Sequence, residues 1–346
     1  MPIEARRAFR LALTVALALA GGYALRLPLP YLAPLFAFFL AAAPAPPMGP
    51  KALLGLVLVL LATLGVGLLL VPLLQHYAFA AVLIVALGLY FSNDLALRRG
   101  QALVGTLLTV GLTMISAAGQ ASFEVAAVVI QALVIGIVLA IVCHWLVYPW
   151  FPEDATPARP KQPAGGGQAN ASWLAVRATL IVLPAYLAAL ANPAAYMPLI
   201  MKSVSLARQD SVSSARHAGR ELLGSTFLGG CCAVLFWFGL KLCPSLWLFF
   251  LWMALFGLYF AAKRYGVFGS RFSPSFWQNT AVTMLIMLGP AVEDSANGKD
   301  VYQAFAVRMA LFVAVTLYAW LAIHLLEQWR SRRFGGAALT AVPEHA

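Results

Sequence analysis

The stretch RLALTVALALAGGYAL at residues 10–25 predicts a membrane-spanning helix, and it has a counterpart in the second half of the chain. A bilayer core about 30 Å thick is crossed by about 20 apolar residues in a helix. Similar stretches recur along the 346 residues, of which 62% are hydrophobic and 10% charged. This composition predicts a polytopic all-α membrane protein; the alternating pattern of an outer-membrane barrel is absent.

Hydropathy predicts about twelve transmembrane segments, six in each half. The first half holds 8–26, 31–44, 52–72, 77–92, 101–119 and 123–147; the second holds 173–191, 194–206, 221–240, 244–262, 275–291 and 302–326. A proline- and glycine-rich stretch, YPWFPEDATPARPKQPAGGGQANAS, lies between them. We therefore expect a six-helix repeat at 1–148, a cytoplasmic linker at 149–172, a second six-helix repeat at 173–330 and a cytoplasmic tail at 331–346.

Short matches in a common order indicate that the halves arose by duplication. KALLG at 51–55 corresponds to RELLG at 220–224, and GLYFSN at 88–93 corresponds to GLYFAA at 257–262, both 169 positions apart (220 − 51 and 257 − 88). RLALTVALALAGGYAL corresponds in the same way to RATLIVLPAYLAAL at 177–190, and YLAPL at 31–35 to YMPLI at 196–200. Because each half has an even number of segments, the repeats should be parallel, related by an axis along the membrane normal.

The distribution of positive charge predicts that both termini are cytoplasmic. The net charge of +11 could suggest nucleic-acid binding in a soluble protein, but in a membrane protein positively charged inner loops explain it. With the N-terminus inside, all but four of the 23 Lys and Arg residues fall on the inner side. The exceptions are Arg26, Lys241, Lys299 and Arg308.

The stretch MKSVSLARQDSVSSARHAGRELLGST at 201–226 is unusually polar for this chain. Its first-half counterpart, AAAPAPPMGPKALLG at 41–55, carries a single charge, Lys51, so the cluster of charges occurs only in the second half. Such asymmetry suits the binding of one anion, because arginine holds a carboxylate in bidentate geometry. The alternative is a solvated loop in which acidic and basic residues pair locally. We expect the cytoplasmic mouth of a substrate path at Lys202, Arg208, Asp210, Arg216, Arg220 and Glu221.

The second segment of each half is short and contains a proline, Pro34 or Pro198. Proline removes a backbone donor and breaks a helix, and paired breaks in two repeats mark the binding site of many transporters. Kinked helices packed by their neighbours are the alternative. We therefore expect the two prolines to shape the site.

Four further polar residues are candidates for a role in the site. Arg10 and Arg177 begin matching segments and are expected to support it. Gln131 and Arg308 lie at similar places in the last segment of each half, where intramembrane polar groups are functional candidates by default.

No catalytic constellation or nucleotide-binding motif occurs, so the sequence predicts neither an enzyme nor a cofactor. A metal site and a disulfide are also not expected, because the cysteines lack paired spacing and lie in or beside apolar segments. These cysteines are Cys143, Cys231, Cys232 and Cys243.

Two regions resemble the fusaric acid resistance and aromatic acid exporter (FUSC) superfamily. RLALTVALALAGGYALRLPLPYLAPLFAFFLA resembles its opening, an arginine-led helix followed by a Pro-Tyr stretch and a second helix. RELLGSTFLGG at 220–230 is similar to its Arg-x-x-x-Gly-[ST]-x-x-x-Gly helix start, and KALLGLVLV is a decayed first copy. The positions that carry the resemblance are Arg10, Pro30, Tyr31, Lys51, Gly55, Arg220, Gly224 and Gly229. The large cytoplasmic domains of many members are missing.

The resemblance implies a bacterial inner-membrane efflux antiporter for aromatic or other hydrophobic weak organic acids, driven by proton motive force. It also implies a periplasmic membrane-fusion adaptor and an outer-membrane channel as partners, while contacts with membrane lipid follow from the apolar segments. The sequence leaves the oligomeric state undetermined. The rivals are an organic-anion channel and a non-transporting assembly or scaffold subunit.

Overall fold

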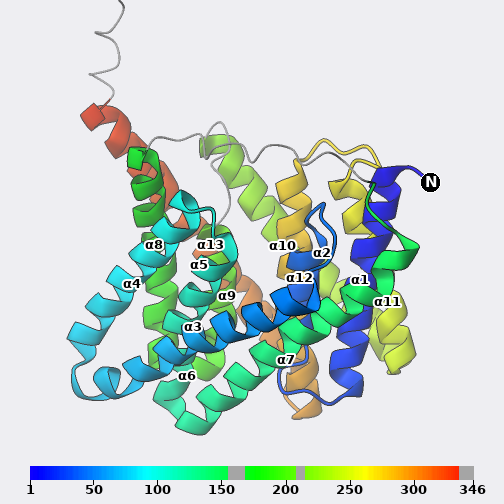
Figure 1. Ribbon diagram of the computed structural model, residues 1–346, viewed down its shortest axis with the longest axis horizontal. Helices are drawn as coiled ribbons and strands as arrows, with labels where there is room; N and C mark the ends of the chain where they lie inside the picture. Colours follow the sequence, from blue (N-terminus) through cyan, green and yellow to red (C-terminus); the bar gives the residue numbers. More distant parts are fainter. Residues whose placement is uncertain (155–167, 208–214, 335–346) are drawn as a thin grey trace, which may run out of the picture.

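The computed structural model describes residues 1–154, 168–207 and 215–334, and in these ranges the chain is helical without strands. Figure 1 shows the helices as one bundle, with the N-terminus and the end of the last helix at the same side. In the first half these are α1 (Ile3–Ala24), α2 (Leu32–Ala41), α3 (Pro50–His76), α4 (Ala78–Arg98), α5 (Ala102–Val110), the π-helix η1 (Gly111–Ile115), α6 (Ser116–Ala121), α7 (Phe123–Val147) and the 3-10 helix η2 (Tyr148–Trp150). In the second half they are α8 (Gln168–Ala191), α9 (Pro193–Ala207), α10 (Ala215–Leu242), α11 (Leu246–Arg264), α12 (Pro274–Ala296) and α13 (Val301–Phe334).

Each expected apolar segment coincides with a helix, the run from α5 through η1 to α6 forming one of them. Within the described ranges, eight helices are long and apolar enough to cross a membrane, and they include α3, α4, α10 and α13. The chain is therefore a multi-pass helical membrane protein. Of the others, α2 and α9 have only 10 and 15 residues, α1 carries three arginines in its first turns, and α12 carries two acidic residues in its last turn.

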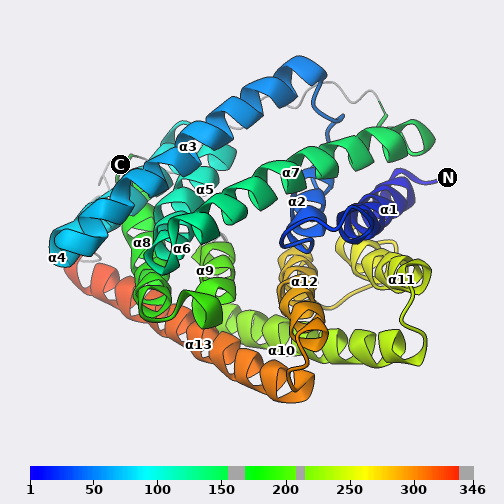
Figure 2. The same cartoon turned by 90° about the horizontal axis from the view of Figure 1, so that it is seen from below.

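Two corresponding pairs of helices connect the halves. α1 lies along α11, and correspondingly α8 lies along α4. Within each half the same pairs recur. The contact of α1 with α2 corresponds to that of α8 with α9, and the contact of α2 with α7 corresponds to that of α9 with α13. The contacts of α3 with α5, η1 and α6 correspond to the contact of α10 with α12. Figure 2 shows α2, α12 and α9 inside a frame whose long sides are formed by α3 and α7 opposite α10 and α13. The short helices thus lie at the centre of the molecule.

Glycines allow the closest of these contacts. A Cβ added at Gly67 of α3 would collide with the carbonyl oxygen of Gly111 in η1. In the second half, a Cβ at Gly229 of α10 would lie 2.6 Å from the carbonyl oxygen of Thr280 in α12. Small residues let membrane helices approach to backbone contact. The same helix pair is therefore joined by glycine in both halves.

The expected breaks at the two prolines do not occur. Pro34 lies in the first turn of α2, where a helix needs no donor from that residue, and α2 continues beyond it. Pro198 lies inside α9, which runs continuously from Pro193 to Ala207. Both prolines are buried, so packing by neighbouring helices holds these segments helical. What distinguishes α2 and α9 is their shortness and central position.

Candidate functional site

The side chain of Lys202 is completely buried on α9, at the point where this helix meets α12. Its Nζ donates hydrogen bonds to Asn279 Oδ1 at 3.0 Å and to Thr283 Oγ1 at 2.7 Å. The two acceptors stand one helical turn apart on the same face of α12, so that one ammonium reaches both. A lysine from one short helix is thereby held by the central helix of the second half.

The polar contacts continue into α10. Asn279 Nδ2 donates to Ser225 Oγ, and the Ser225 hydroxyl donates to the backbone carbonyl of Leu222 at 3.1 Å. Lys202, Asn279, Thr283 and Ser225 are each at most 1% exposed. We call these four side chains the Lys202 cluster. It joins α9, α10 and α12 around one potential positive charge.

The bonded partners of the Lys202 ammonium are neutral. Among the described residues, seven ion pairs form, and Lys202 takes part in none of them. A buried charge without a partner of opposite sign is expensive, and an intramembrane charge more so. An ammonium has three N–H donors and two are used here, which leaves one for a ligand. The arrangement is suited to an anionic group such as a carboxylate.

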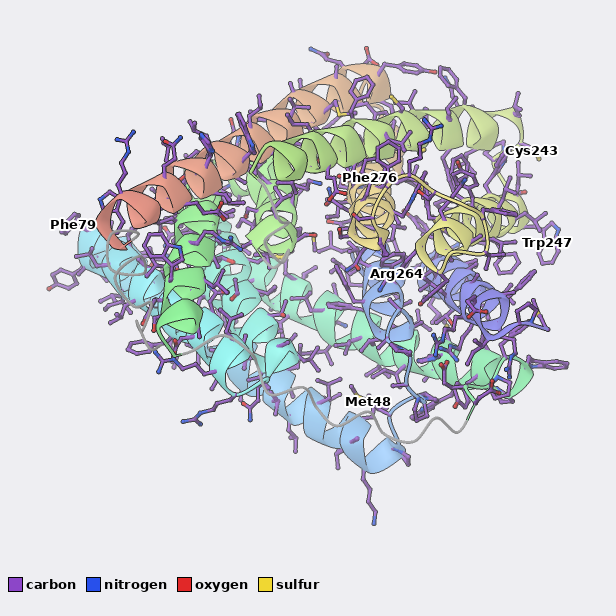
Figure 3. The ribbon with its side chains drawn as sticks, turned by 90° about the horizontal axis from the view of Figure 1, so that it is seen from above. Met48, Phe79, Cys243, Trp247, Arg264 and Phe276 are labelled. Atoms are coloured by element: carbon purple, nitrogen blue, oxygen red, sulfur yellow. The ribbon has the colours of Figure 1, made fainter. Side chains whose placement is uncertain are left out.

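The first half has no such charge at the matching place. Aligning Pro34 with Pro198 puts Phe38 of α2 where Lys202 stands in α9, and Phe38 is 3% exposed. The guanidinium of Arg264 lies 6.0 Å from the centre of the Phe38 ring. Figure 3 labels Arg264 beside the N-terminal end of α12, where its Nη1 donates to Gln278 Oε1 at 2.7 Å. The one-sided charge expected from the sequence is therefore present inside the bundle at Lys202.

Arg10 binds a carboxylate outside the Lys202 cluster. Together with Arg7 it binds the carboxylate of Glu153, which follows η2. Arg10 Nη2 lies 2.8 Å from Glu153 Oε2, Arg7 Nε lies 2.6 Å from Glu153 Oε1, and Arg10 Nη1 donates to the carbonyl of Phe151 at 3.2 Å. Burial of the Glu153 carboxyl raises its pKa, but the hydrogen bonds and positive charges of both arginines outweigh this and hold its pKa below the ordinary value. This clamp ties the chain after α7 to the start of α1.

A comparable ion pair occurs in the second half. Arg177 of α8, the sequence counterpart of Arg10, lies 3.6 Å from Glu327 of α13. Glu327 is 40% exposed, whereas Glu153 is 8% exposed. Glu327 lies in α13, whereas Glu153 follows α7 and η2, so each pair ties the first helix of a half to the closing part of that half. These two arginines therefore have a structural role in this structure.

The remaining predicted residues are dispersed. Tyr31 precedes α2 and is 6% exposed, with its ring against Gly289 of α12. Arg308 of α13 forms an ion pair with Asp294 at the far end of α12. Gln131 is exposed on α7, and Glu221 is half-buried near the start of α10. In the described part of the structure, none of these four side chains forms a hydrogen bond with a side chain of the Lys202 cluster.

The arginine-rich part of the expected mouth is not described. Arg208 and Asp210 lie outside the described residues. Arg216 and Arg220 belong to the first turns of α10, but their side chains are outside the described part.

Sequence reasoning missed three of the residues that matter most. Ser225 and Thr283 are common residue types in membrane helices, and only the spacing of four between Asn279 and Thr283 hints at a shared polar face. Glu153 stood in a stretch interpreted as a plain linker, although its acidic charge complements the arginines of α1. In the described residues, no three His, Cys, Asp or Glu side chains gather as a metal site would require.

Comparison with known families gives one match. Residues 7–147 match the family described as "Protein of unknown function (DUF2955)". The match begins in α1 and ends with α7; it covers less than half of the chain and leaves Lys202 outside. No curated protein and no solved structure gives a significant match.

Proposed function

We propose that this protein is a secondary transporter that exports hydrophobic weak organic acids, as anions, across a bacterial inner membrane, and that Lys202 binds the carboxylate. One observation carries the proposal: a completely buried lysine whose hydrogen bonds go to neutral acceptors. Close to Lys202 on α9, Leu199 lies in the hydrophobic core and Met201 packs against it, which favours a substrate that is apolar apart from its charged group. Asn279 and Thr283 position the ammonium, and the third N–H of Lys202 binds the anion.

The transport unit has twelve spans in two parallel repeats, 1–148 and 173–330, with both termini in the cytoplasm. The matched helix order and the matched packing pairs support the repeats. The concentration of Lys and Arg on one side supports the orientation. In this arrangement α2 and α9 are short spans at the centre, where α9 presents its lysine to α12.

The membrane potential drives this export. An anion that leaves a cell with a negative interior gains about 2.3 kcal/mol per 100 mV. When Lys202 carries its proton, the ammonium neutralises the bound anion inside the bundle, so that binding needs no second charged group. The drive therefore comes from the electrical part of the proton motive force. A periplasmic adaptor and an outer-membrane channel, which the resemblance to exporters implies, would carry the product outward.

Transport requires the Lys202 cluster to open. Lys202 is sealed from solvent in this structure, so α9 and α12 must separate to admit a substrate. This separation breaks the two hydrogen bonds that the Lys202 ammonium donates to the uncharged side chains of Asn279 and Thr283. Because α9 is short and has lost one backbone bond at Pro198, it is the element expected to move.

The test is uptake of labelled benzoate, salicylate and cinnamate into liposomes containing the purified protein, with a potential imposed by potassium and valinomycin. The Lys202→Met variant keeps the length of the side chain and removes its charge. Since a hydrogen bond to a charged group contributes about 1.5–3 kcal/mol, apparent affinity should fall roughly ten- to hundred-fold. Lys51→Met, at an exposed lysine that begins α3, is the matched control and should transport normally.

Three results would contradict the proposal. Full activity of Lys202→Met would remove the lysine from the transport path. Movement of none of the acids by the unaltered protein would favour the scaffold alternative. Flux that rises linearly with concentration, without saturation, would favour the anion channel.

A further inference from the structure

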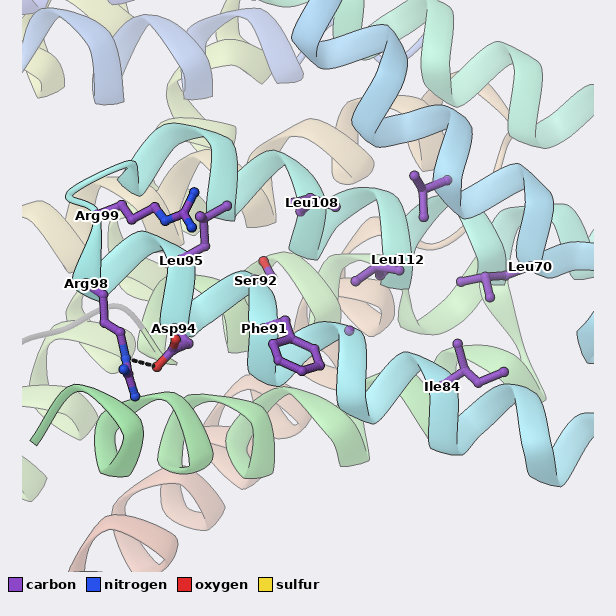
Figure 4. Close-up of a pocket in the computed structure, with 12 residues that line it drawn as sticks. Leu70, Ile84, Phe91, Ser92, Asp94, Leu95, Arg98, Arg99, Leu108 and Leu112 are labelled. Atoms are coloured by element: carbon purple, nitrogen blue, oxygen red, sulfur yellow. Dashed lines mark hydrogen bonds and ion pairs between the residues drawn. The ribbon is translucent and has the colours of Figure 1, made fainter. Parts of the chain in front are cut away.

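A second candidate site lies on the opposite half of the bundle, between α3, α4 and the α5–η1 run. These helices border an open groove of about 620 Å³, which is within the size range of ligand pockets. Figure 4 shows its apolar side chains along the two diverging helices α3 and α4. The apolar lining includes Val66, Leu70, Ile84, Phe91, Leu108 and Leu112.

The groove is open at the surface of the bundle. Ile84 is 47% exposed and Phe91 58% exposed, although both point from α4 into the lining. In the second half, the counterpart of Phe91 is Phe260, which is 1% exposed and lies against Trp277 and Phe256. Aromatic packing therefore covers in α11 the face that α4 leaves uncovered.

One end of the groove is basic. Arg98 and Arg99 close α4 and line the cavity together with Asp94. Arg98 Nε donates to Asp94 Oδ1 at 2.7 Å and its Nη2 to Ser172 Oγ at 2.5 Å, so its charge is largely compensated. Arg99 is exposed and takes part in none of the ion pairs of the described residues. The mouth therefore carries one net positive charge beside an apolar channel.

We propose that this groove binds an anionic phospholipid of the inner leaflet, with an acyl chain along α3 and α4 and the phosphate at Arg99. The α4–α5 turn lies on the cytoplasmic side of the proposed topology, where a headgroup of that leaflet would be. A soluble anion would gain nothing from an apolar lining that faces lipid, whereas an acyl chain fills it. The charge at the mouth selects anionic over zwitterionic headgroups.

The experiment is native mass spectrometry of the full chain, delipidated in detergent and then supplied with either dioleoyl phosphatidylglycerol or dioleoyl phosphatidylcholine. The unaltered protein should retain phosphatidylglycerol about five-fold better, as expected for one basic residue near a phosphate. Arg99→Gln should lose that preference. Arg271→Gln, at an exposed arginine of the turn between α11 and α12 on the same side, should keep it.

A second variant tests the groove itself. Ile84→Trp fills the cavity from an exposed position and should lower retention of both lipids, with helix content unchanged by circular dichroism. Equal retention of the two lipids by the unaltered protein would overturn the proposal, as would equal behaviour of Arg99→Gln and Arg271→Gln. Retention of both lipids by Ile84→Trp would move the lipid out of this groove. Because lipid is counted directly, the result is independent of whether the protein transports acids.

Discussion

Neutralising Glu153 should destabilise the protein far more than neutralising its neighbour Asp154. The Glu153 carboxylate is 8% exposed and holds Arg10, which is 0% exposed. Removing one partner of a buried pair costs about 3–5 kcal/mol, because the other charge stays buried. Arg7 is 25% exposed, and a glutamine still accepts one hydrogen bond, so we expect about 3 kcal/mol for Glu153→Gln. Asp154 is 60% exposed beside Arg6, and Asp154→Asn should cost about 0.2–1 kcal/mol.

The same ion pair predicts how stability depends on pH. The folded pKa of Glu153 is lowered from its ordinary value of 4.5. Its contribution to the free energy of unfolding is therefore complete above about pH 4.5, and it disappears as the pH falls through the lowered folded value. Consequently, the difference between the unaltered protein and Glu153→Gln should be full at neutral pH and should shrink in acid.

The assay is unfolding in mixed micelles with increasing sodium dodecyl sulfate, followed by circular dichroism at neutral and acidic pH. The reasoning fails if Glu153→Gln and Asp154→Asn lose equal stability at neutral pH. It also fails if the loss in Glu153→Gln grows as the pH falls, since that would mean that the carboxylate is stabilised in its protonated form.

Three further predictions concern packing, the far ion pair and orientation. Gly67→Ala should lower the free energy of unfolding by about 1–3 kcal/mol, because the added methyl group collides with the backbone of η1. Gly65 has open space around it, so Gly65→Ala should leave the free energy of unfolding unchanged or raise it by up to about 1 kcal/mol. The same unfolding assay compares the two variants. Arg308→Met and Asp294→Asn should each destabilise, and a double-mutant cycle should give a coupling of about 0.5–3 kcal/mol; a coupling near zero would mean that the pair contributes nothing. The exposed Cys243, in the turn after α10, should react in whole cells with a thiol reagent that cannot cross the membrane; labelling only after permeabilisation would invert the proposed topology.

The apolar segments could be located from the sequence because they are a local property. A run such as 123–147 must be helical in lipid, since each backbone donor needs a partner within the segment, and α7 has these bounds. The prediction for Pro34 and Pro198 was wrong in detail, because the effect of a proline depends on its place in the turn and on the packing around it. The shortness of α2 and α9 was visible in the sequence.

The helical membrane class, the order of the segments and the extra positive charge in one half can all be predicted from the amino-acid sequence. Which of those charges is buried, and which groups hold it, depends on the folded arrangement. Lys202 meets Asn279 across 77 positions, and Arg10 meets Glu153 across 143. Hydropathy depends on neighbours along the chain, whereas a buried ammonium needs acceptors supplied by other helices. Those partners follow from how α9, α10 and α12 pack, which no local pattern specifies.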